Sequence, residues 1–200
     1  MAVKSLWVTA IAAIVLAPLH TKNRSIQTLS DSGIPTSHPF SPLVLLTALA
    51  YFRYGALADY EKAKALFERA LSIREKLQGT NHPDTATSIN DLARVLQTHG
   101  NLDRAQSLFE RALTIREKIL GSEHPDTATT LNDLGRLLRR REDLVRARPL
   151  IERALGIRQK AFGDDSPEVA SSLINLGQLL KSKGNLSRAR PLLERGVEIT

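Results

Sequence analysis

Two consecutive stretches of the chain, each 42 residues long, have closely similar sequences. Residues 66–107 and 108–149 are identical at 25 of 42 aligned positions, including the runs Leu-Phe-Glu-Arg-Ala-Leu and His-Pro-Asp-Thr-Ala-Thr. A unit that recurs at a fixed period does not bury its apolar face alone and must stack on its own copies. The repeat therefore predicts an open solenoid, and a chain without an enclosed active-site cavity.

Each unit is predicted to contain two helices. The first helix begins at a proline followed by an acid, because proline suits the first helical position and an acid favours the helix N-terminus. These starts are His82-Pro83-Asp84, His124-Pro125-Asp126 and Ser166-Pro167-Glu168. A short turn leads to the second helix at Gly100-Asn101, Glu142-Asp143 and Gly184-Asn185. The glycines that follow the second helices are expected C-caps: Gly79, Gly121 and Gly163.

Small and bulky residues recur at equivalent places in the two helices. The small residues of the first helix are Ala50, Ala93, Gly135 and Gly177. The second helix carries a small residue at Ala63, Ala105, Ala147 and Ala189, and a bulky one at Phe67, Phe109, Ile151 and Leu193. A further small residue follows at Ala70, Ala112, Ala154 and Gly196. This pattern resembles the tetratricopeptide repeat, and the resemblance implies an all-α solenoid of antiparallel helix pairs wound as a right-handed superhelix.

The long period points to one type of this repeat. Tetratricopeptide repeats usually have a period of about 34 residues. The period of 42 and the Gly-x-x-His-Pro-Asp loops at residues 79–84 and 121–126 are similar to the kinesin light chain type, as found in bacterial multi-repeat proteins. The resemblance implies a non-catalytic scaffold for a protein or peptide partner. The heptad coiled coil of kinesin light chains is absent from this sequence.

Three segments are predicted along the chain. Residues 1–21 form a hydrophobic N-terminal segment, residues 22–41 a linker rich in Ser, Thr, Pro and Gly, and residues 42–200 about four repeats. The repeats span 42–79, which is degenerate in its first helix, then 82–121, 124–163 and a truncated 166–200. An apolar edge without a polar cap is expected at the end of the fourth repeat, which makes this edge a candidate for self-association. Its residues are Leu192, Leu193, Val197 and Ile199.

The N-terminal segment leaves two interpretations open. Residues 6–19 are 14 apolar residues, which is short for a membrane span and suits the core of a signal peptide. A small-x-small cleavage site is not clear, because Ala17 is followed by Pro18, and Lys22 and Arg24 balance Lys4. We expect a cytoplasmic chain; the alternative is a membrane-tethered or exported adaptor in which residues 5–19 make the membrane contact.

The composition argues against several classes of function. The chain has no cysteine, which excludes disulfides and thiolate metal sites. The net charge of +7 comes from basic and acidic residues that are interspersed, as on a solvated helix surface, so no nucleic-acid partner is predicted. The sequence contains no phosphate-binding loop, nucleophile elbow or metal-ligand spacing. We therefore predict neither enzymatic activity nor a cofactor or metal.

Two recurring polar motifs have structural explanations. His82 and His124 precede the first helices, and the third copy has Ser166, a favoured N-cap, so capping is favoured over metal binding. A Glu-Arg pair recurs in every repeat and is explained by surface ion pairing rather than by catalytic carboxylates. These pairs are Glu68-Arg69, Glu110-Arg111, Glu152-Arg153 and Glu194-Arg195.

The first helices of tetratricopeptide arrays line a concave groove, so the resemblance implies which side chains would meet a ligand. Asparagine amides there can bond an extended peptide backbone, at about 0.5–1.5 kcal/mol net per hydrogen bond, and Arg or Lys would favour carboxylates. We therefore expect a partner with an acidic segment; the alternative is that Arg139-Arg140-Arg141 is only a solvated helix end. The predicted groove residues are Asn90, Arg94, Gln97, Asn132, Arg136, Arg139, Asn175, Gln178 and Lys181, with Tyr51 and Tyr54 beside the first repeat.

Overall fold

The computed structural model of the chain describes residues 47–50 and 59–200. The predicted N-terminal segment and linker, together with Tyr51 and Tyr54, lie outside the described residues. The chain divides into two compact units, Met1–Leu77 and Gln78–Thr200, which we describe separately. None of the helices in the described ranges has the length and apolar character needed to cross a membrane.

The first unit contains most of helix α4 (Tyr60–Gln78) and a short helical segment at residues 47–50. The buried side chains of α4 recur at helical spacing, and their volumes alternate between small and large, as predicted from the sequence. They are Ala63, Leu66, Phe67, Ala70 and Leu71. Leu49 and Ala50 are also buried.

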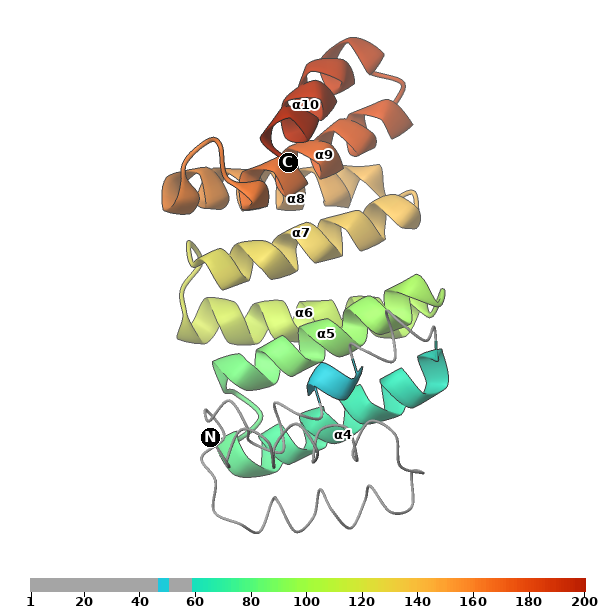
Figure 1. Cartoon of the computed structure of the whole chain (residues 1–200), viewed down its shortest axis with the longest axis vertical. Helices are drawn as coiled ribbons and strands as arrows, with labels where there is room; N and C mark the ends of the chain where they lie inside the picture. The colour runs from blue at the N-terminus through green and yellow to red at the C-terminus, as the bar shows by residue number, and fades with distance from the viewer. Residues whose placement is uncertain (1–46, 51–58) are drawn as a thin grey trace, which may run out of the picture. The chain divides into compact units, whose positions relative to one another are not determined.

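The second unit is built of three antiparallel helix pairs that follow one another along the chain (Figure 1). Each pair packs tightly within itself, and its second helix packs on the first helix of the next pair. The pairs are α5 (Pro83–Thr98) with α6 (Leu102–Ile119), α7 (Pro125–Arg140) with α8 (Leu144–Phe162), and α9 (Pro167–Ser182) with α10 (Leu186–Ile199). The described residues form helices and no strands, so the predicted all-α solenoid class is confirmed.

The first helix of each pair starts at the predicted proline and has the predicted cap. His82 and His124 accept the backbone N–H of Asp84 and Asp126 through Nδ1, at 3.2 and 3.1 Å. Ser166 performs the same role with Oγ, which accepts the Val169 N–H at 3.2 Å. The capping interpretation of the two histidines is therefore confirmed, and it accounts for the exchange of histidine for serine in the last pair.

The long loop between repeats is closed by a recurring hydrogen bond. The hydroxyl groups of Thr85 and Thr127 donate to the carbonyls of Gly79 and Gly121, each at 2.9 Å. Both glycines have positive φ angles, 88° and 97°, which L-residues with a side chain rarely adopt. The loop thus turns on the glycine and is tied to the first turn of the next helix by the threonine.

Glycine allows the closest approach of the two helices in the last two pairs. A Cβ atom on Gly135 would lie 2.5 Å from Cγ1 of Ile151, and one on Gly177 would lie 2.7 Å from Cγ of Leu193. In both pairs, a glycine of the first helix thus packs against a bulky side chain of the second. At the end of the array, Leu192, Leu193 and Ile199 are half-buried, whereas Val197 is 69% exposed, so the apolar edge is smaller than predicted.

Candidate functional site

The first helices α5, α7 and α9 are joined side to side by polar side chains. Asn90 of α5 donates through Nδ2 to Oδ2 of Asp133 on α7, at 3.0 Å. One repeat later, Asn175 of α9 donates through Nδ2 to Oδ1 of Asn132 on α7, also at 3.0 Å. The two contacts are equivalent. The residue three positions before the small residue of one first helix bonds the residue two positions before the small residue of the next first helix; these small residues are Ala93, Gly135 and Gly177.

A second contact recurs nearer the C-terminal ends of these helices. Arg136 donates through Nη2 to Oε1 of Gln97 at 3.2 Å, and Arg139 donates through Nη2 to Oε1 of Gln178 at 3.0 Å. These two contacts are also equivalent. Gln97 and Arg139 lie four positions after the small residue of their helix, and Arg136 and Gln178 lie one position after the small residue of the next first helix. We call the four contacts the polar ladder: Asn90–Asp133, Asn132–Asn175, Gln97–Arg136 and Arg139–Gln178.

The ladder separates the predicted groove residues into two groups. The amides Asn90, Asn132, Asn175 and Gln97 are buried, and Asn90 and Asn132 are only 3% and 4% exposed. Their amide groups bond the neighbouring repeat, whereas the sequence predicts that Asn90 and Asn132 hold a peptide backbone. The accessible group is Arg94 and Lys181, which are exposed, and Arg136, Arg139 and Gln178, which are half-buried.

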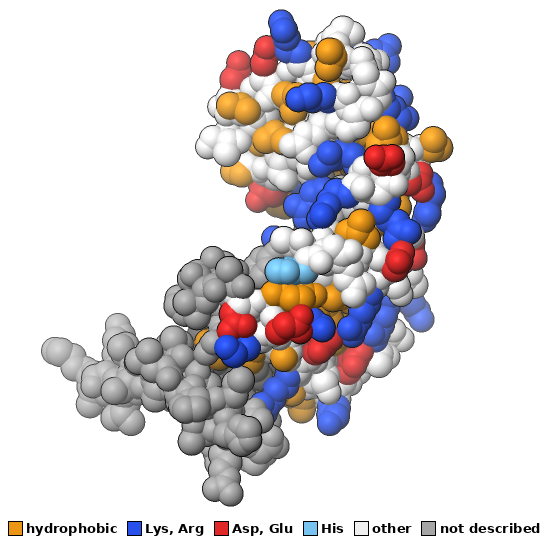
Figure 2. All heavy atoms as spheres, turned by 90° about the vertical axis from the view of Figure 1, so that its right-hand side faces the viewer, with side chains coloured by type: hydrophobic (Ala, Val, Ile, Leu, Met, Phe, Trp, Pro, Cys, Tyr) orange, Lys and Arg blue, Asp and Glu red, His pale blue; other side chains and the backbone are white. Residues whose placement is uncertain are grey.

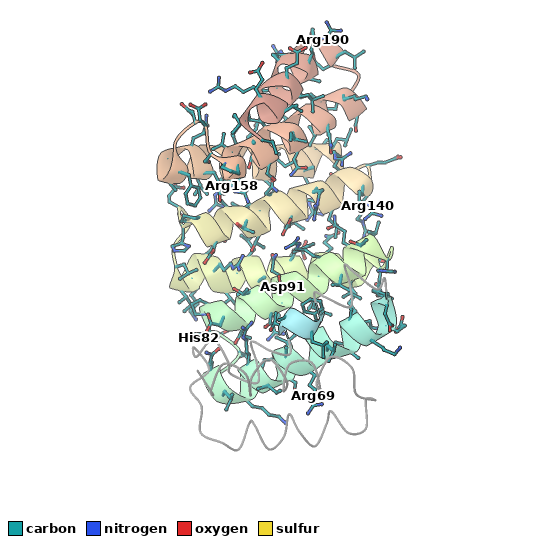
Figure 3. All side chains as sticks on the ribbon, in the orientation of Figure 1. Arg69, His82, Asp91, Arg140, Arg158 and Arg190 are labelled. Atoms are coloured by element: carbon teal, nitrogen blue, oxygen red, sulfur yellow. The ribbon has the colours of Figure 1, made fainter. Side chains whose placement is uncertain are left out.

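The arginines of α7 form a cluster of positive charge. Arg136 forms an ion pair with Asp133 at 3.3 Å, and Arg140, labelled in Figure 3 at the end of α7, donates through Nη1 to the carbonyl of Gln97 at 2.6 Å. Burial, together with the positive charges of Arg136 and Arg140, lowers the pKa of Arg139 below its usual value. An anion bound beside Arg139 would relieve this repulsion.

The guanidinium groups of the cluster keep unused donors. Each guanidinium has five N–H donors. The Nε atoms of Arg136 and Arg139 are buried without a hydrogen-bond partner, and the Arg136 side chain is 37% exposed. The ladder contacts therefore fix these side chains in place, and the buried Nε groups are not open to a ligand.

A pocket opens where α7 and α9 end. Its volume is about 470 Å³, and its lining consists of Arg139, Arg140, Glu142, Leu144 and Ser182. Figure 2 looks at the side of the molecule where α7 ends and shows Lys and Arg side chains gathered near the middle of the visible face. The pocket combines two cations, one carboxylate, one hydroxyl and an apolar wall.

Sequence reasoning did not identify two buried arginines that link successive repeats. Arg116 of α6 donates to the Asp126 carbonyl and to Oγ1 of Thr130 on α7, at 2.8 and 2.7 Å, and to Oγ1 of Thr87 on α5 at 3.0 Å. Burial lowers its pKa, while the nearby carboxylates of Asp126, Asp91 and Asp133 oppose the shift. Arg116 thereby joins three helices.

Arg158 of α8 repeats this arrangement one unit later. It donates to the Glu168 carbonyl and to Oγ of Ser172 on α9, at 3.1 and 2.8 Å, and to Oγ1 of Thr129 on α7 at 3.3 Å. The sequence signal was the Ile-Arg pair that recurs every 42 residues, followed by neighbouring hydroxyl residues of the next unit. We call Arg116 and Arg158 the inter-repeat arginines.

Within the described ranges, His, Cys, Asp and Glu side chains form no group of three that could hold a metal ion. The accessible polar surface described above consists of side chains that carry charge or can form hydrogen bonds. Its fixed cations and pocket lie on and between the first helices of successive repeats.

Comparisons with known proteins agree with this architecture. A tetratricopeptide repeat family model matches residues 43–118, 100–158 and 126–200. A comparison with curated proteins gives no match. The crystal structure of BtubC (BKLC) from P. vanneervenii is similar, with 25% identity, a TM-score of 0.72, and coverage of 90% of this chain and 72% of that one.

A second crystal structure is also similar. It is described as a P. anserina kinesin light chain with nearly identical TPR-like repeats, and it shares 26% identity with a TM-score of 0.64. The match covers 88% of this chain and 82% of that one. The chain therefore belongs to the tetratricopeptide repeat family, and its repeats are of the kinesin light chain-like type.

Proposed function

We propose that this repeat scaffold binds an acidic segment of a partner protein through the accessible cations of α5, α7 and α9. Tetratricopeptide repeats typically mediate interactions between proteins, and the kinesin light chain-like proteins are generally non-catalytic. The cations that carry the proposal are Arg94, Arg136, Arg139 and Lys181.

The observation that carries the proposal is the positive charge of α7, where Arg136, Arg139 and Arg140 lie close together and, within the described residues, only Arg136 is paired with a carboxylate, that of Asp133. Arg136 and Arg139 are held by the polar ladder, so little side-chain entropy remains to be lost when a ligand binds. Burial lowers the pKa of Arg139, and the positive charges of Arg136 and Arg140 lower it further. Carboxylates in an extended segment would supply further negative charge beside these guanidinium groups.

The flanking cations extend this surface over three repeats. Arg94 lies on α5 and Lys181 on α9, and both side chains are exposed. Within the described residues, neither side chain takes part in a hydrogen bond or ion pair. The sites for carboxylates thus follow one another from repeat to repeat, which suits a segment with several acids rather than a single one.

Charge reversal tests the proposal. The wild-type chain and the Arg136→Glu/Arg139→Glu variant are immobilised and used to capture proteins from lysate, with identification by mass spectrometry. We expect the variant to lose the partners whose segments are acidic. Its affinity for such a partner should fall at least about tenfold, and the salt dependence of this binding should weaken.

The matched control is Arg146→Glu/Arg148→Glu, which makes the same change of charge on helix α8. These two arginines form ion pairs with Glu110 and Glu152. The control should keep the partners, and circular dichroism should show that both variants remain folded. The same partners on wild type and on Arg136→Glu/Arg139→Glu would contradict the proposal.

A further inference from the structure

One turn of the second unit has glutamate at a position where the two equivalent turns have glycine. The turns from the first to the second helix of each pair carry Gly100, Glu142 and Gly184, with φ angles of 84°, 63° and 76°. Among the described residues, Glu142 is the one non-glycine residue with positive φ. This conformation is disfavoured for L-residues because Cβ approaches the carbonyl oxygen. Such a residue often marks a functional position.

The turn itself does not use the Glu142 side chain. The Glu142 N–H donates to the Arg139 carbonyl at 3.0 Å, and its carbonyl accepts from the Leu144 N–H at 2.9 Å. Gly184 makes the equivalent bonds, with the Lys181 carbonyl at 2.9 Å and the Leu186 N–H at 3.0 Å. A glycine therefore satisfies the same backbone contacts, and the fold does not account for the carboxylate.

The carboxylate of Glu142 lies in the lining of the pocket described above. An ionised carboxylate only accepts hydrogen bonds, and because Glu142 is exposed, water can supply the donors in the free chain. In the described part of the chain it forms no ion pair, and the neighbouring arginines have other acceptors: Arg139 bonds Gln178, and Arg140 bonds the Gln97 carbonyl. The pocket thus presents two cations and one carboxylate beside the apolar side chain of Leu144.

We infer that this pocket binds a lysine or arginine side chain that lies within the acidic segment of the partner. The inference rests on the proposed function. The electrostatic complement of two cations and one carboxylate is a segment with at least two acids and one base. The acids neutralise Arg139 and Arg140, the aliphatic stem of the base lies along Leu144, and its charged end donates to Glu142.

Selection from a display library of random nonapeptides tests the inference and does not require the partner to be identified. The targets are the full wild-type chain, Glu142→Gln, Glu142→Gly, Arg136→Glu/Arg139→Glu and the control Glu152→Gln, which removes an exposed carboxylate elsewhere on α8. We expect acidic residues to be enriched on all targets except Arg136→Glu/Arg139→Glu. We expect Lys or Arg at one fixed position relative to these acids on wild type and Glu152→Gln only.

Affinity measurements with a selected peptide follow. Replacing its basic residue with methionine should weaken binding to wild type about fivefold and leave binding to Glu142→Gln unchanged. Acidic enrichment without a fixed basic position, or with the same basic position on Glu142→Gln, would overturn the inference and leave the proposed function standing. Loss of acidic enrichment on wild type would overturn both.

Thermal unfolding separates a structural role of Glu142 from this one. Because glycine adopts positive φ without strain, Glu142→Gly should raise the melting temperature by about 2–4 °C, while Glu142→Gln should leave it nearly unchanged. A lower melting temperature for Glu142→Gly would show that the side chain serves the turn, and the inference would be wrong.

Discussion

Single methyl groups determine how closely the helices of a pair approach. Gly135 lies against Ile151, and Gly177 lies against Leu193, at distances that leave no room for a Cβ atom. Gly156 of α8 is different, since no atom outside its own surroundings lies within 4 Å of a Cβ built there. Gly135 of α7 and Gly156 of α8 therefore differ in what their surroundings require. Packing requires glycine at position 135 and does not require it at position 156.

Alanine substitutions at these two glycines should have opposite effects. Both variants gain helix propensity of about 0.8–1 kcal/mol, but Gly135→Ala also overpacks the interface, at a cost of about 1–3 kcal/mol. We expect Gly156→Ala to unfold at higher urea concentration than wild type and Gly135→Ala at lower concentration. Equal midpoints for the two variants would show that Ile151 moves aside without cost.

At the residue scale, the sequence predicts local partners better than distant ones. Gly135 and Ile151, which are in contact, both belong to the recurring small and bulky positions identified in the sequence. The contact of Asn90 with Asp133 spans 43 residues and depends on how two first helices are rotated against each other. An asparagine on a helix face can point to a ligand or to the next repeat, and the sequence does not distinguish these two cases.

The starts of the first helices are governed by interactions within a single turn. Proline at the first helical position, the acid after it and the capping side chain before it all act locally, so the starts at Pro83, Pro125 and Pro167 were predicted correctly. The inter-repeat arginines escaped prediction because each one needs three helices to be in place before its donors find acceptors. The sequence thus predicts where the first helices start, and it predicts contacts between helices less well.

The cap at α7 can be tested by exchanging it for its own equivalent. His124→Ala removes the acceptor of the Asp126 N–H and should reduce the free energy of unfolding by about 0.5–2 kcal/mol. His124→Ser should retain most of this stability, because Ser166 caps α9 with its hydroxyl. Urea unfolding monitored by circular dichroism measures both. Equal losses in both variants would indicate that the imidazole contributes by packing rather than by capping.

Across residues 78–200, stability depends on the bonds between successive pairs. Helix α8 is joined to α6 and to the loop after it by ion pairs at the surface. Glu117 of α6 pairs with Arg153 at 2.7 Å, both half-buried, and Glu123 of the loop pairs with Lys160 at 2.9 Å, both exposed. Exposed pairs of this kind contribute little each and weaken with salt. The inter-repeat arginines are buried, so the coupling between repeats should depend mainly on them.

Removal of one inter-repeat arginine tests this division. Arg116→Met leaves the Asp126 carbonyl and the Thr130 hydroxyl without their donor and should reduce the free energy of unfolding by about 1–3 kcal/mol. Lys160→Met breaks only the exposed pair with Glu123 and should change it by about 0.2–1 kcal/mol. Denaturant unfolding at low and high salt measures both changes. Similar losses for the two variants would argue against the dominance of the buried contacts.

The polar ladder also restricts how such an array could grow by duplication. If the pair that begins at Pro83 were copied in tandem, Gln97 would meet a second Arg94, an amide against a guanidinium, as in the present contact with Arg136. If the pair that begins at Pro125 were copied, Arg139 would meet a second Arg136, two donors without an acceptor. The helix pairs are therefore not interchangeable modules, and their order along the chain is specified by which of them donates and which accepts.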